Sequence, residues 1–134
     1  MANALYDKGR NAFLEGKIDW VDDTIKVVLI DSADYSVDLA NDEFLNDVPS
    51  AARISTATLS GKTAVDGIAD ADDATFDNVT GDEAEALVLY KDTGQESTSP
   101  LIAYIDSATG LPVTPSGSDI VIAWNDGTTK IFKL

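Results

Sequence analysis

The sequence predicts a mainly β protein: an antiparallel β-sandwich or jelly-roll-like barrel with a short N-terminal helix. Two observations lead to this fold class. Apolar runs of strand length recur along the chain, and most are separated by residues typical of turns, namely Gly, Pro, Asn and Asp. The chain has 134 residues, a common size for one domain. We therefore expect a single domain over residues 1–134, in which residues 1–20 form a helix or arm and residues 24–134 form the β domain.

The first expected element is a helix over residues 2–16. Five apolar or small residues recur there at helical spacing: Leu5, Tyr6, Gly9, Ala12 and Phe13. Asn3 is a suitable N-cap for this helix, and Gly16 is a suitable stop. The apolar stripe is narrow, so we expect the helix to lie against a sheet or a partner rather than to be stable alone.

Three buried strands are expected after the helix. Residues 24–30 (TIKVVLI) are rich in β-branched side chains and become apolar on both faces, which is typical of a central strand. Residues 85–90 (EALVLY) and 101–105 (LIAYI) repeat this pattern. Residues 67–75 are small and acidic, and residues 109–118 contain two prolines and two glycines, so both segments are expected to be loops.

Shorter strands complete the predicted sheets. Residues 53–59 alternate in the manner of a half-buried strand, and a Ser-Gly turn leads from them to a short strand at 62–65. Near the C-terminus, the apolar runs 120–124 and 128–134 flank Asn125-Asp126-Gly127. An Asp-Gly pair between two alternating apolar runs favours a β-hairpin, so we expect these two runs to pair with each other.

The net charge of -15, from 24 acidic and 9 basic residues, restricts the function. Such a chain repels nucleic-acid phosphates and anionic lipid surfaces, so neither class of partner is expected. The sequence has no His and no Cys, which removes the commonest general base, the thiolate nucleophile and cysteine-bound zinc. We therefore expect a protein that is not an enzyme, has no catalytic residue and needs no cofactor.

Two groups of aspartates could supply oxygen ligands to a hard cation such as calcium. The first group is Asp70, Asp72, Asp73 and Asp77. The second group is Asp31, Asp34 and Asp38. The first group lacks the glycine and glutamate of a helix-loop-helix calcium loop, since Thr75 and Gly81 stand at those positions. The interpretation that we prefer is a solvated acidic loop in both places, with bound calcium as the alternative.

Four residues near the N-terminus are the candidates for a protein interface. Trp20 stands at a polar boundary just after the expected helix, and Leu5, Tyr6 and Phe13 lie on the apolar side of that helix. Large aromatic side chains at such positions often anchor protein contacts, so we expect these four to contact a neighbouring chain.

Other conspicuous side chains have a structural explanation. Tyr90, Tyr104 and Trp124 lie within apolar strands, which predicts that they belong to the core. Arg53 begins a strand in a strongly acidic chain, so we expect it to pair with a carboxylate of the same chain.

The sequence resembles a group of small phage and prophage proteins, and the resemblance spans almost the whole chain. It rests on structural residues rather than on a catalytic motif. The N-terminal segments that carry it are Met1 to Arg10, Phe13-Leu14, Ile18-Asp19-Trp20, Thr24 to Val27 and Asp31 to Tyr35. The later segments are Glu85 to Val88, Tyr90 to Gly94, Leu101 to Asp106, Gly110 to Val113 and Lys130 to Leu134.

This resemblance implies a virion structural protein, and the closest role is that of a capsid decoration (cement) protein. Such a protein is made in the host cytoplasm, docks on the outer surface of the shell formed by the major capsid protein, and stabilises that shell. Closed symmetry favours a homo-oligomer, preferably a dimer at capsid two-fold positions and otherwise a trimer at three-fold positions. The alternative is a tail or fibre module that binds a receptor or a glycan. No docking residue can be transferred from the resemblance.

Overall fold

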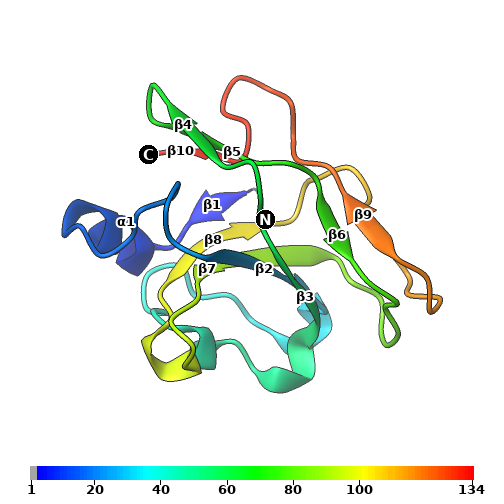
Figure 1. Cartoon of the computed structure of the whole chain (residues 1–134). Helices are drawn as coiled ribbons and strands as arrows, with labels where there is room; N and C mark the ends of the chain where they lie inside the picture. The colour runs from blue at the N-terminus through cyan, green and yellow to red at the C-terminus, as the bar shows by residue number, and fades with distance from the viewer. Residues whose placement is uncertain (1–2) are drawn as a thin grey trace.

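The computed structural model describes residues 3–134 as a mainly β protein with antiparallel strands and one α-helix. A five-stranded sheet with the order β1-β8-β7-β2-β3 lies at its centre (Figure 1). A three-stranded sheet, β10-β5-β4, and a two-stranded sheet, β6-β9, lie together over one face of it. The central sheet is therefore covered by strands on one side and by a long loop on the other.

The elements are short, as the turn-rich sequence predicts. The helical segments are α1 (Asp7–Leu14) and four 3-10 turns, η1 (Ser32–Asp34), η2 (Leu45–Asp47), η3 (Ser50–Ala52) and η4 (Glu96–Thr98). The first strands are β1 (Ala4–Leu5), β2 (Ile25–Ile30), β3 (Arg53–Thr58), β4 (Thr63–Val65) and β5 (Ile68–Asp70). The remaining strands are β6 (Ala74–Phe76), β7 (Ala86–Lys91), β8 (Leu101–Ile105), β9 (Ile120–Ile122) and β10 (Phe132–Lys133).

The central strands are apolar on both faces because both faces are buried. Alternate residues of β2 contact different core clusters: Val27 and Leu29 belong to one cluster, and Val28 and Ile30 belong to the other. Strand β2 lies between β3 and β7, which confirms its predicted central position. The predicted strand at 101–105 coincides with β8. This two-sided burial is the physical reason for the continuous apolar runs in the sequence.

Helix α1 packs directly on the backbone of β8. A Cβ atom at Gly9 would lie 2.5 Å from the carbonyl oxygen of Leu101, so only glycine permits this approach. The helix begins at Asp7, later than predicted, because Ala4 and Leu5 pair with β8 as strand β1. The predicted cap, Asn3, instead binds the backbone of Ser107. The start of the predicted helix, residues 1–2, lies outside the described residues.

The predicted C-terminal hairpin is wrong. Strand β9 pairs with β6, and β10 pairs with β5. The hairpin turn would require positive φ at two central residues, yet neither Asp126 nor Gly127 has a positive φ. The pairing of β9 with β6 is favoured over a local hairpin because it places Phe76 and Ile122 in the core, where both are fully buried.

The acidic segment 67–75 was expected to be a loop. It instead contains β5 and the start of β6. Its strands are only three residues long and carry few β-branched side chains, so their pattern is weak. Within residues 3–134 no sheet closes on itself, so the barrel form of the prediction is not established. No helix in the same range is long and apolar enough to cross a membrane.

The close packing of α1 on β8 leads to a first prediction. Gly9→Ala should lower the free energy of unfolding, because overpacking against a backbone carbonyl costs about 1–3 kcal/mol and exceeds the gain of about 1 kcal/mol from helix propensity. Asn11→Ala, at an exposed position of the same helix, is the matched control and should not destabilise the protein. Urea denaturation measures both variants. Equal or higher stability of Gly9→Ala than of the control would contradict the packing argument.

Candidate docking groove

A shallow apolar groove lies where the end of α1 meets the three-stranded sheet. It encloses about 390 Å³, and its lining is mostly apolar. Phe13 and Ile18 come from α1 and the segment after it, Ala64 and Ala69 from β4 and β5, and Phe132 from β10. Thus residues from both ends of the chain and from its middle form one surface.

Phe132 organises the aromatic part of the groove. Its ring centroid lies 5.2 Å from that of Trp20 in an edge-on arrangement and 5.9 Å from that of Phe13. Trp20 is only 5% exposed, and its indole N–H donates a hydrogen bond of 3.3 Å to the carbonyl oxygen of Asp70. Two of the four predicted interface residues, Phe13 and Trp20, therefore meet in the groove, but Trp20 forms its buried floor rather than a projecting anchor.

Exposed apolar side chains gather around this groove. Five large apolar residues are strongly exposed in the described chain; Leu134 lines the groove, and Leu14 and Val21 directly follow the lining residues Phe13 and Trp20. Their exposed fractions range from 47% to 81%. Exposed apolar side chains at an apolar groove are typical of a docking site. Sequence reasoning missed these three residues, because an isolated exposed valine or leucine has no distinguishing pattern.

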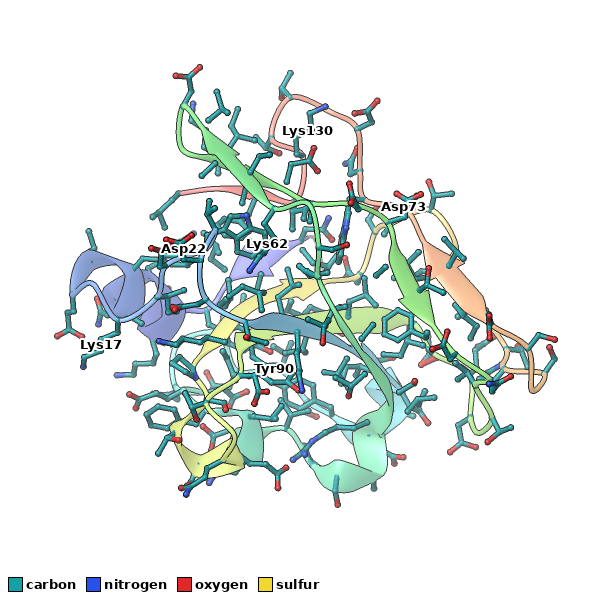
Figure 2. All side chains as sticks on the ribbon, viewed as in Figure 1. Lys17, Asp22, Lys62, Asp73, Tyr90 and Lys130 are labelled. Carbon is teal, nitrogen blue, oxygen red and sulfur yellow. The ribbon has the colours of Figure 1, made fainter. Side chains whose placement is uncertain are left out.

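The charged residue that lines the groove is acidic. It is Asp19, and Asp22 is an exposed residue of the same turn. Figure 2 places Asp22 on the α1 side of the molecule, and Lys17 lies near the same helix. Lys17 is paired with Glu15 at 3.1 Å. An apolar floor with an acidic rim favours a partner that offers an apolar side chain surrounded by basic groups.

No protein-family model and no curated protein matches this chain. The groove is consequently the strongest functional observation, because it is supported by geometry, exposure and charge together. The chemistry of the groove suits binding, because its lining combines apolar side chains with one carboxylate, that of Asp19.

The other two predicted interface residues lie away from the groove. Leu5 is 5% exposed and belongs to the core cluster beneath the smaller sheets. Tyr6 is fully buried in the cluster on the opposite face of the central sheet. Their burial within a single chain explains their apolar character without a partner. Tyr90, Tyr104 and Trp124 are buried as predicted.

Tyr6 belongs to a buried chain of hydrogen bonds. The hydroxyl of Tyr35 donates to Oδ2 of Asp42 at 2.6 Å, so the hydroxyl of Tyr6, 2.8 Å away, donates to Tyr35. Burial raises the pKa of both tyrosines, and the neighbouring Asp42 carboxylate adds to the shift. Both hydroxyls therefore stay protonated at neutral pH. The chain of bonds ties the long loop after β2 to the start of the protein.

The carboxylates of the first aspartate group do not converge on one point. Within residues 3–134, no three carboxylates of Asp70, Asp72, Asp73 and Asp77 come close enough to share an ion. The carbonyl oxygens of Asp70 and Asp72 accept hydrogen bonds from the indoles of Trp20 and Trp124, the second at 2.9 Å. The segment therefore anchors two buried tryptophans, and Figure 2 places Asp73 away from the α1 side of the molecule.

The second aspartate group differs from the expected one in a single residue. Oxygens of Asp31 and Asp34 lie within 4.8 Å of each other and of Asp82, which replaces Asp38. Asp38 instead caps a turn by accepting hydrogen bonds from Ala40 and Asn41. Asp31 already caps the turn η1 through a bond of 3.0 Å from the amide of Ala33. These contacts explain the aspartates as loop-stabilising residues, so we assign no metal to them.

Arg53 forms the predicted intramolecular ion pair. Its guanidinium contacts the carboxylate of Glu96 and also donates to the carbonyl oxygen of Val48, at 2.7 Å from one nitrogen. This side chain holds the turns η2, η3 and η4 together and is not available as a ligand contact.

The tyrosine chain leads to a second prediction. Tyr35→Phe should reduce the free energy of unfolding by about 1–3 kcal/mol, because it leaves the buried hydroxyl of Tyr6 without its acceptor and removes one of the two hydrogen bonds that Oδ2 of Asp42 accepts. Tyr104→Phe is the matched control: Tyr104 is equally buried, but its hydroxyl has no hydrogen bond within residues 3–134. Its cost should stay within about 0.5 kcal/mol. Thermal and urea unfolding compare the two, and equal losses would contradict the proposed role of the hydrogen bonds.

Proposed function

We propose that this protein is a capsid decoration protein that docks on the outer surface of a phage shell and stabilises it. The observation that carries the proposal is the apolar groove, which is lined by the acidic Asp19 and by the exposed Leu134. The resemblance found in the sequence supplies the biological setting. Binding to the assembled shell but not to free subunits stabilises the shell by mass action, which requires a docking surface and no active site.

The charge supports docking on a shell that contains nucleic acid. A chain with a net charge of -15 does not compete for the packaged nucleic acid, and it is attracted to basic patches on the major capsid protein. The same charge opposes association between free copies in solution. We therefore propose that the homo-oligomer, a dimer or otherwise a trimer, forms on the shell, where basic partner groups offset the repulsion.

The alternative, a glycan-binding tail or fibre module, lacks a supporting surface. Sugar binding on a β scaffold relies on exposed aromatic rings. Eight aromatic side chains are buried: Tyr6, Trp20, Tyr35, Phe76, Tyr90, Tyr104, Trp124 and Phe132. The other two, Phe13 and Phe44, are half-buried. The aromatic residues serve the core, so the decoration role is the better proposal. In this role the β-sandwich-like arrangement of sheets is a rigid support for the groove.

Copy number in the virion tests the proposed function. Quantitative mass spectrometry of purified virions of the encoding phage should give a ratio to the major capsid protein near one or a simple fraction of it, because decoration covers a whole icosahedral lattice. A few copies per particle would instead support the tail or fibre alternative. Complete absence from the particle would contradict both.

A pair of charge substitutions tests the groove. Leu14→Lys replaces an apolar side chain next to the groove-lining Phe13 by a positive charge, at a position that is 81% exposed, so folding should be unaffected. Because the added charge repels the basic groups of the partner, we expect it to weaken binding to assembled shells by about tenfold or more, a typical cost of about 1.4 kcal/mol for disturbing an interface anchor. Val121→Lys is the matched control, since Val121 is 53% exposed on β9, outside the groove. Cosedimentation with shells measures both, and similar affinities for the two variants would exclude the groove as the docking site.

A further inference from the structure

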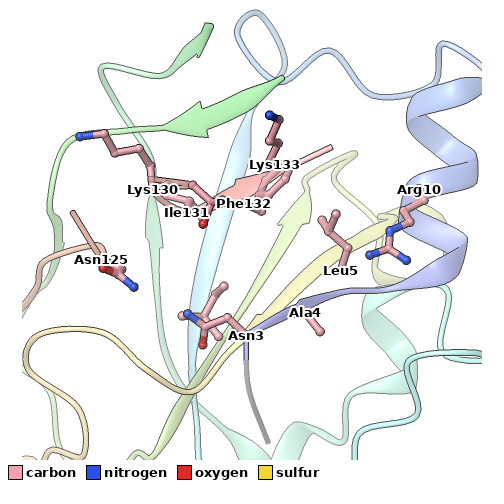
Figure 3. A pocket seen from close by; sticks show the side chains of 11 residues that line it. Asn3, Ala4, Leu5, Arg10, Asn125, Lys130, Ile131, Phe132 and Lys133 are labelled. Carbon is pink, nitrogen blue, oxygen red and sulfur yellow. The ribbon is translucent and has the colours of Figure 1, made fainter. Parts of the chain in front are cut away.

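A second surface lies where two sheet edges border the same cavity. Strand β1 is the outermost strand of the central sheet, and β10 is the outermost strand of the three-stranded sheet. Each has a strand partner on one side only, β8 for β1 and β5 for β10. Both strands line one cavity of about 200 Å³ (Figure 3). Two open edges therefore flank a single cleft.

The inner side of this cleft is apolar and already closed. Leu5 of β1, Ile105 of β8 and Phe132 of β10 line the cavity, and all three belong to the same buried core cluster. The shared core holds the two sheets beside each other although their edges are not paired. An extended segment entering the cleft would therefore meet apolar side chains on its inner face and backbone groups on both sides.

The outer side of the cleft is basic, unlike the rest of the molecule. Arg10, Lys130 and Lys133 line it, which is three of the nine basic residues, and none of the lining residues described is acidic. Arg10 pairs with Asp7 at 3.6 Å, and Lys130 pairs with Asp126 at 2.7 Å, both at exposed positions. Exposed ion pairs are weak and readily exchanged. Lys133 has no ion pair within residues 3–134.

We propose that this cleft binds an extended segment of another protein chain, in which apolar and acidic residues alternate, as a strand added between β1 and β10. The backbone of such a segment would find hydrogen-bonding groups on both sides, which is the usual basis of strand addition. Because side chains of a strand alternate between faces, one set would pack on the apolar floor and the other would meet the basic rim. Insertion would join the two sheets into one continuous sheet.

The occupant is a different chain rather than a second copy of this one. Stretches of this sequence that combine apolar and acidic residues, such as residues 18–23, are already used in the fold, and that stretch holds the buried Trp20. Releasing it would uncover the groove floor. Two copies, each with a charge of -15, also repel each other. The inference goes beyond the decoration role and holds for any partner with such a segment.

Nuclear magnetic resonance on the full chain tests the proposal with two synthetic peptides, one alternating valine and glutamate and one alternating valine and lysine. The glutamate peptide should slow amide exchange in residues 4–5 and 132–133, and the lysine peptide should not bind. Lys133→Glu should weaken binding of the glutamate peptide by about fivefold. Lys8→Glu is the matched control, because Lys8 is exposed on the helix that carries Arg10 but does not line the cavity.

Four results would overturn the proposal. Protection at the open edges of β3 or β4 in place of β1 and β10 would move strand addition elsewhere. Equal binding of both peptides would remove the role of the basic rim. The same spectral changes with inorganic phosphate alone would make the cleft a small-anion site. Self-association with protection of β1 and β10 in the absence of peptide would make a second copy the occupant. None of these results bears on the copy number in virions, so the decoration role is tested separately.

Discussion

The fold depends on one constraint: the five-stranded sheet must be covered on both faces. Its central strands carry apolar side chains on each side, and most of these are fully buried. One face is covered by the two smaller sheets, and the other is covered by residues of the 31–52 loop such as Tyr35 and Val48. The hydrogen bonds from Tyr6 through Tyr35 to Asp42 help to hold this loop, whose pairing with the strands in residues 3–134 is limited to a bridge between Phe44 and Pro100.

The two proposed binding surfaces are consequences of how the covering layer is built. It consists of strands of two or three residues, which are too short to cover the whole face of the central sheet or to pair at every edge. Two hollows remain, one where the covering layer meets α1 and one where it meets β1. The first hollow is the apolar groove, and the second is the cleft between β1 and β10.

The parts of the fold that could be predicted are those fixed by local pattern. Residues 101–105 and 24–30 show buried strands directly, because two-sided burial requires a continuous apolar run. The pairing of Phe76 with Ile120 could not be predicted, since it is decided by side chains distant in sequence. Asp82 was missed for the same reason: it meets Asp31 and Asp34 only after the chain has folded. Trp20 was expected to contact a neighbouring chain; that it forms the buried floor of a groove depends on Phe132 at the other end of the chain.

Strand β10 links the two surfaces physically. Phe132 lines both the groove and the cleft, and its strand is held by β5 alone. A two-residue strand with one partner is among the less stable parts of a sheet, so its order limits the order of both surfaces. A partner that fixed β10 at one surface would therefore also fix part of the lining of the other. The proposed partners differ in charge: basic groups for the groove, and acidic groups for the cleft.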